Sequence, residues 1–335
     1  MTSGERDPTV RPGGELLVRF FGVRGSTPCC SPEVHQYGGN TSCVVVEAPG
    51  AHPILLDLGT GCRIYGESLD PAVPFRATAL VSHLHWDHVQ GLPFFGPALR
   101  PGSHIDLLAP PPGSGMTLGE ALDTCLRPPF FPVTVAELPG TITVREAEPG
   151  GTFPLGPVTV TARTVPHVGP TAGFRLEWEG ASLAYIPDHQ QPGEHAEQVD
   201  EQVLALARGV DLLIHDAQYT PEEFAAKSNW GHSTVPYAVE VARRAEARTL
   251  ALFHHDPLHV VATVDQLLGE ARLQAGCGFD VIAAREGLTL RLPAGGTDAG
   301  PAHALAAAAD RFLTPAPHRT RVAGAAGAAR VAGSY

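Results

Sequence analysis

Short apolar runs recur along the chain, and stretches of helical spacing lie between some of them. Runs of about four to eight residues rich in β-branched and aromatic side chains predict strands. They are residues 16–22, 42–47, 105–108 and 141–144 in the first half, and 182–186, 212–215 and 249–253 in the second. Residues 198–207 and 235–247 have the period of helices, the second capped by Ser233 or Thr234. The pattern predicts an α/β fold with few helices in its first half.

Both ends of the chain differ in composition from the middle. Residues 1–14 are polar with Gly and Pro, which predicts a flexible tail. Residues 293–335 are dominated by Ala, Gly, Pro and Arg, which predicts disorder with a candidate helix at 302–312. One domain is therefore expected over residues 15–292. Within it, residues 101–157 carry many prolines and glycines between short strands such as 105–108 and 141–144, and we expect irregular structure there that covers the functional site.

The charge balance argues against a protein that binds long nucleic acids. The 335 residues include 23 Lys and Arg against 35 Asp and Glu, and a net charge of −12 repels a polyanion where no basic patch offsets it. Apolar runs long enough to span a membrane are missing from the sequence. The six cysteines form no Cys-x-x-Cys pair, so we expect reduced, mostly buried thiols and a cytoplasmic location.

The most informative segment runs from Val81 to His88 and reads VSHLHWDH. It places His83, His85, Asp87 and His88 within six residues, directly after a strand-like apolar run. A buried carboxylate beside buried imidazoles needs a charge partner, because an unpaired buried charge costs several kcal/mol. A divalent cation supplies that partner. Because the side chains of this loop can point in different directions, the segment could supply ligands to two cations.

This segment has the form H-x-H-x-D-H and resembles the signature of the metallo-β-lactamase superfamily. Other segments resemble the superfamily in the same order: PILLDLGTG at 53–61, TVPH at 164–167, YIPD at 185–188 and LALFHHDP at 250–257. The resemblance covers roughly residues 15–292 and implies an α/β fold built as a four-layer αββα sandwich. It also implies that Asp57 is structural and fixes the H-x-H loop through hydrogen bonds.

The resemblance implies a ligand set for each of two divalent metal ions. The first ion would be held by His83, His85 and His167, the second by Asp87, His88 and His254, with Asp188 bridging them. His255 competes with His254 for the last position, and we favour His254 because it directly follows the apolar run. Zinc accepts these nitrogen and oxygen ligands, and manganese or iron fits them as well.

Within the superfamily the likeness is to the phosphodiesterase branch that includes ribonuclease Z. GHST at 231–234 and LIHDA at 213–217 resemble two elements of that enzyme, although Asp216 stands where ribonuclease Z has a glutamate. Only about twenty residues separate His167 from Asp188, too few for the protruding arm with which ribonuclease Z grips transfer RNA. The missing arm argues against transfer-RNA processing.

The implied reaction is hydrolysis of a small phosphodiester, such as a cyclic nucleotide, by a water that two cations activate. Asp87 would orient that water, and His232, held by Asp216, would protonate the leaving alkoxide. Three alternatives remain open: a hydrolase of a carboxylic ester, lactone or lactam, a mononuclear iron oxygenase of the same fold, and a binding protein without catalysis. The expected partner is a small molecule and neither a membrane nor a long nucleic acid, and a homodimer stays open.

Overall fold

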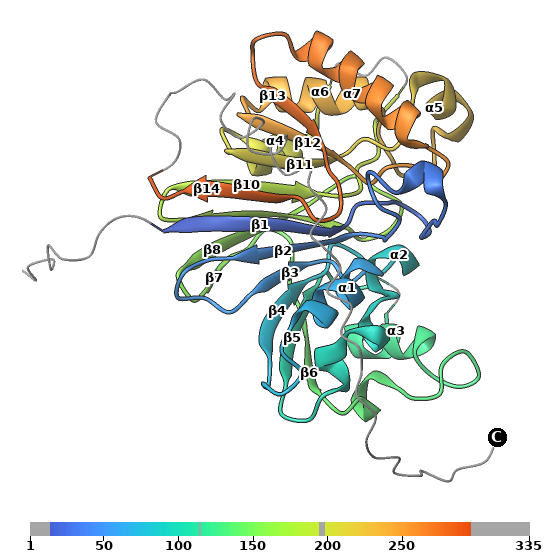
Figure 1. The fold of residues 1–335 in the computed structure, drawn as a ribbon, viewed down its shortest axis with the longest axis vertical. Helices are drawn as coiled ribbons and strands as arrows, with labels where there is room; N and C mark the ends of the chain where they lie inside the picture. Colours follow the sequence, from blue (N-terminus) through green and yellow to red (C-terminus); the bar gives the residue numbers. More distant parts are fainter. Residues whose placement is uncertain (1–13, 114, 194–197, 296–335) are drawn as a thin grey trace, which may run out of the picture.

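Two seven-stranded β-sheets stack face to face in the computed structural model, which describes residues 14–113, 115–193 and 198–295 (Figure 1). Helices cover the outer side of each sheet, so the described residues form the expected four-layer αββα sandwich (Figure 1). Almost all of the predicted N-terminal tail, and the chain from residue 296 onward with its candidate helix, lie outside the described residues.

The first sheet combines strands from the N-terminal half of the chain with the last strand. β1 pairs antiparallel with β14 and with β2, whereas β3 to β6 run parallel to one another. In spatial order the strands are β14 (Thr289–Pro293), β1 (Glu15–Gly22), β2 (Cys43–Glu47), β3 (Ile54–Leu56), β4 (Arg76–Leu80), β5 (His104–Ala109) and β6 (Thr141–Glu146).

The second sheet is built from the second half of the chain. β10 to β13 run parallel to one another, and β7 to β10 form an antiparallel meander. In spatial order the strands are β13 (Asp280–Ala283), β12 (Thr249–Phe253), β11 (Leu212–Asp216), β10 (Ala181–Ile186), β9 (Ala172–Trp178), β8 (Val158–Thr164) and β7 (Thr152–Leu155).

The helices divide between the two sheets. Side chains of α1, α2 and α3 share a core with the first sheet, and those of α4, α6 and α7 share a core with the second. Their bounds, with those of α5, are α1 (Gly61–Ser68), α2 (Trp86–Val89), α3 (Leu118–Cys125), α4 (Glu201–Ala207), α5 (Pro221–Lys227), α6 (Val235–Arg244) and α7 (Val261–Ala275).

The central core lies between the sheets, and both contribute alternate side chains to it. Leu16, Val18 and Phe20 point inward from β1 and are fully buried. Phe174 and Leu176 do the same from β9. This period-2 alternation is the pattern of a strand with one face on a core.

Truncating one of these core side chains is expected to destabilise the fold strongly. Leu176→Ala leaves a cavity between the sheets and should lower the free energy of unfolding by about 2–5 kcal/mol. Leu273 on α7 is 84% exposed, so Leu273→Ala should change it by less than about 0.5 kcal/mol. Denaturant unfolding of both variants measures the difference. Equal stability of the two would contradict the assignment of the central core.

Parallel strands direct the functional loops to one edge of each sheet. Asp57 directly follows β3, and His83 lies three residues after β4. In the second sheet, Asp188 lies two residues after β10, and His254 directly follows β12. The carboxyl ends of parallel strands meet at the same edge, where ligands gather in layered α/β folds. The topology therefore collects these four residues without any long loop.

The predicted strands and helices within the described residues are present, and two other expectations are wrong in whole or in part. All seven predicted strands occur, and α6 is capped by Thr234, whose hydroxyl accepts from the Tyr237 amide. The expectation of irregular structure between the short strands of residues 101–157 is wrong in part, because α3 and β7 also lie there. The six cysteines are free thiols as expected, but only Cys43 and Cys62 are buried, so "mostly buried" is wrong. Within the described residues, no helix has the length and apolarity that crossing a membrane requires.

Candidate metal centre

Seven His and Asp side chains converge between the carboxyl-terminal ends of the strands. The loop after β4 and the single turn of α2 supply four of them, and the segments after β8, β10 and β12 supply one each. They are His83, His85, Asp87, His88, His167, Asp188 and His254. The structure thus brings together every residue predicted as a ligand, from segments far apart in the sequence.

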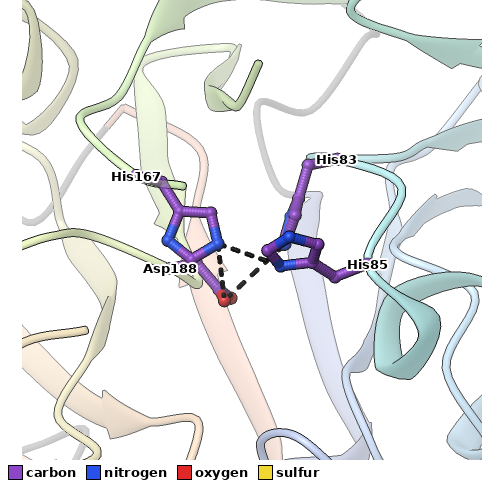
Figure 2. Close-up of side chains that lie close together, drawn as sticks. All are labelled: His83, His85, His167 and Asp188. Carbon is purple, nitrogen blue, oxygen red and sulfur yellow. Dashed lines mark hydrogen bonds and ion pairs between the residues drawn. The ribbon is translucent and has the colours of Figure 1, made fainter. Parts of the chain in front are cut away.

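The first group consists of His83, His85, His167 and Asp188 (Figure 2). His167 Nε2 lies 3.1 Å from His85 Nδ1. Asp188 Oδ2 lies 3.7 Å from His83 Nε2 and 3.6 Å from His167 Nε2. One ligand atom from each residue lies within 4.8 Å of the others. Three imidazole nitrogens and a carboxylate oxygen that face one space are a donor set suited to a divalent cation.

The second group consists of Asp87, His88 and His254. His254 Nε2 lies 3.1 Å from Asp87 Oδ2, and His88 Nε2 lies 3.2 Å from the same oxygen. Asp188 Oδ1 lies 3.1 Å from His88 Nε2 and 3.3 Å from His254 Nε2. Asp188 therefore directs one carboxylate oxygen toward each group, which is the geometry of a bridging ligand.

The outer nitrogens of three histidines are held by protein oxygens. His88 Nδ1 lies 2.7 Å from Asp57 Oδ2, His254 Nδ1 lies 2.9 Å from Gln218 Oε1, and His167 Nδ1 lies 2.7 Å from the Gly231 carbonyl. Because an oxygen acceptor draws the ring proton to Nδ1, the Nε2 lone pair is left to face the cluster. Such contacts fix the tautomer that metal binding requires.

Asp57 fixes the H-x-H loop through hydrogen bonds, as expected from the sequence, and it also contacts the second sheet. Its carboxylate accepts hydrogen bonds from the Ser82 amide at 2.6 Å and the Ser82 hydroxyl at 2.9 Å, so it fixes the start of the H-x-H loop. It also accepts from the Tyr185 hydroxyl on β10 at 2.7 Å. Asp57 is fully buried and adopts a left-handed backbone with φ 62°. The cost of that conformation is offset by these buried charge-assisted bonds.

The polar atoms of the cluster fit a cation. Within the described residues, His83 Nε2 and Asp188 Oδ1 are buried and receive no hydrogen bond of acceptable geometry, although His88 Nε2 lies 3.1 Å from the latter. Burial lowers the pKa of His83 well below its usual value, which favours the neutral, ligating imidazole. Burial works to raise the pKa of Asp188, but the neighbouring His254 and His88 hold it well below the usual range. Buried polar atoms without partners are costly, and a metal ion would satisfy both.

His232 and Asp216 form a pair beside the cluster. His232 Nδ1 lies 3.0 Å from Asp216 Oδ2 and 3.6 Å from Asp188 Oδ2. Asp216 is itself fixed by the backbone amides of His189 and Gln218, each at 3.0 Å. Burial works to lower the pKa of His232, but the charge of Asp216 and its hydrogen bond raise it above the ordinary value. The predicted dyad is therefore present as a contact.

The structure also places residues that the sequence left open or did not single out. His255 Nε2 lies 2.9 Å from the Ala284 carbonyl, outside the cluster that contains His254. Tyr185, Gln218 and Ser26 contact residues of the centre but were not predicted. The sequence indicated only weakly that Gln218 lies at the centre, since it comes two residues after Asp216. It contained no such indication for Ser26, because its partner Asp87 is 61 residues away in the sequence.

Two stacked sheets with a His/Asp cluster at the strand ends are the architecture of the metallo-β-lactamase fold. Residues 53–255 match the Beta-lactamase superfamily domain, and the chain belongs to this superfamily. Ribonuclease Z of Natronomonas pharaonis is 26% identical to it over 277 residues, which cover 71% of this chain and 86% of the relative.

Solved structures agree on the fold. The metallo-β-lactamase fold protein YhfI from Bacillus subtilis matches 83% of this chain and 99% of its own with a TM-score of 0.64 at 17% identity. A diphosphatase from the PhnP family matches 82% of this chain and 97% of its own with a TM-score of 0.58 at 18% identity. Both likenesses concern the fold.

Proposed function

We propose that this protein is a binuclear metal-dependent phosphodiesterase that cleaves a small phosphodiester such as a cyclic nucleotide. The observation that carries the proposal is the placement of Asp188, whose two oxygens face two separate ligand groups. Zinc is our first candidate for the bound metal, and manganese or iron suits the same donors. When bound, two such ions supply a water with a pKa near neutrality and neutralise charge on the phosphoryl oxygens.

The chain's own residues supply the proton transfers. Asp87 Oδ2 faces His254 and His88 and can orient the attacking water. His232 is anchored through Nδ1 to Asp216, which leaves Nε2 to donate a proton to the leaving oxygen. The raised pKa of His232 favours the protonated form that an acid needs. Because a poor alkoxide leaving group needs a proton and an activated ester does not, the presence of a general acid such as His232 favours a phosphodiester with an alkoxide leaving group as the substrate.

The segment between His167 and Asp188 supports a small substrate. It forms β9 and β10, a hairpin inside the second sheet, where ribonuclease Z would carry its arm. The net charge of −12 opposes a long polyanion, whereas a small diester needs only the local charge of the metal ions. The ribonuclease Z relative and the PhnP-family diphosphatase act, by their names, on phosphate linkages.

We also propose a cytoplasmic location, supported by six free thiols.

Metal content separates the hydrolase from the oxygenase of the same fold. Protein purified without chelator should contain two equivalents of divalent metal per chain by elemental analysis, because the predicted ligands form two groups and Asp188 faces both. Dialysis against a chelator should remove both and abolish turnover, and added zinc or manganese should restore it. A single equivalent of iron would contradict the binuclear proposal.

A substrate panel tests the choice of bond. Cyclic nucleotides and bis(4-nitrophenyl) phosphate should be hydrolysed, whereas lactones, thioesters and precursor transfer RNA should be turned over at least about 100-fold more slowly. The reason is that binding and acid catalysis are matched to a small phosphoryl group. Preferred hydrolysis of a lactone or thioester would replace the proposal with carboxylic ester chemistry.

A further inference from the structure

Ser26 lies at the rim of the metal centre and has no part in the function proposed above. It is exposed, and it belongs to the loop that follows β1. Its backbone amide donates at 2.7 Å to Oδ2 of Asp87, a member of the second ligand group. Its hydroxyl oxygen lies 3.2 Å from Gln218 Nε2. These contacts place an exposed hydroxyl beside the position where a substrate would meet the metal centre.

In its contact with Gln218 the Ser26 hydroxyl is the acceptor, so its own hydrogen remains free to be donated. Gln218 Oε1 accepts from His254 Nδ1 at 2.9 Å, so the amide nitrogen of Gln218 must face Ser26. The Ser26 oxygen is therefore the acceptor in that contact. A hydroxyl has one hydrogen to donate, and here it stays available.

The backbone at Ser26 is held in a conformation that favours glycine. Its φ is 61°, and among the described residues only five other than glycine have a positive φ. Asp57 and His254, both at the centre, are two of the others. A serine with this backbone conformation is strained, and strain of this kind is found mainly at functional sites.

The loop is also fixed firmly in place. Arg24 is fully buried, and its guanidinium donates to the carbonyls of Gly38, Asp256 and His259 at 2.8 to 2.9 Å. A Cβ on Gly25 would lie 2.4 Å from His254 Nδ1, so the loop is in tight contact with the second ligand group. A donor held this rigidly loses little entropy when it binds a ligand.

We propose that Ser26 is a substrate-binding residue whose hydroxyl donates a hydrogen bond to a non-bridging oxygen of the phosphodiester. This inference rests on the proposed phosphodiesterase function. It explains why an exposed serine occupies a strained position beside Asp87 although glycine would fit the backbone better.

The test compares Ser26→Ala and Ser26→Gly with the metal-loaded wild type on bis(4-nitrophenyl) phosphate. Both variants lose the hydroxyl and keep the backbone amide, so both should retain two metal equivalents and lose about 10- to 100-fold in kcat/KM. Ser26→Gly also relieves the backbone, so its unfolding temperature should equal the wild-type value or exceed it by about 2–4 °C. Thr27→Ala, which removes the neighbouring exposed hydroxyl, is the matched control and should change neither quantity.

The outcomes separate the inference from the function on which it rests. A more stable but slower Ser26→Gly supports it. Loss of metal in both variants would show that Ser26 acts only through Asp87 and would overturn substrate binding. Unchanged kcat/KM in both variants would also overturn substrate binding by Ser26, but it would leave the phosphodiesterase proposal intact. Lack of turnover by the metal-loaded wild type would instead overturn the proposed function, and this inference with it.

Discussion

Asp188→Ala is expected to abolish hydrolysis and to lower bound metal from two equivalents to one or fewer. The carboxylate directs Oδ2 toward His83 and His167 and Oδ1 toward His88 and His254, so one substitution removes a ligand from both groups. We expect turnover to fall by about four orders of magnitude, equivalent to roughly 5–6 kcal/mol of transition-state stabilisation. Elemental analysis and steady-state kinetics on the same preparation measure both effects.

Two further variants complete this experiment. His83→Ala removes a ligand from the first group only, and we expect it to lose one equivalent of metal and most activity. Asp70→Ala is the control, because Asp70 is an exposed residue outside the cluster. Full metal content and full turnover in Asp188→Ala would refute the ligand assignment, whereas their loss in Asp70→Ala would point to misfolding.

The cluster of candidate ligands could be predicted from the sequence because its members lie in short segments next to predicted strands. Four of the seven lie within six residues, and Asp188 and His254 closely follow apolar strands whose carboxyl ends the topology must bring together. For the last ligand position the sequence favoured His254 over His255 but could not decide between them, since both follow the same strand. The structure adds the physical reason: His255 donates toward the Ala284 carbonyl, while His254 faces the cluster.

The supporting contacts could not be predicted, because they join residues that are distant in sequence. Tyr185 meets Asp57 across 128 positions, and Ser26 meets Gln218 across 192. Hydrophobic periodicity carries no information about such pairs. The error over residues 101–157 has a different origin. We expected irregular structure there because of the many prolines and glycines, and α3 was therefore missed. Its start was nevertheless visible in the sequence, since Thr117 and Glu120 have the spacing of a capping box and form one.

His232→Ala is expected to keep both metal equivalents and yet slow cleavage of a cyclic nucleotide by about two to four orders of magnitude, the range for loss of general acid catalysis. His232 contacts Asp216 through Nδ1, and its proposed work is to protonate the leaving alkoxide. A nitrophenolate leaving group needs little protonation, so bis(4-nitrophenyl) phosphate should suffer much less. An equal rate loss on both substrates would remove His232 from the acid role and indicate positioning in its place.

The same acid role predicts a shift in the pH profile of Asp216→Asn. Burial alone would lower the pKa of His232, and the negative charge of Asp216 raises it. Because the acid must be protonated, activity on a cyclic nucleotide should fall as the pH rises through the pKa of His232. Removing the charge of Asp216 lowers that pKa, so the fall should move to lower pH, with a smaller rate loss than in His232→Ala. A pH profile identical to that of the wild type would show that Asp216 does not tune His232, and the dyad would then be a structural contact only.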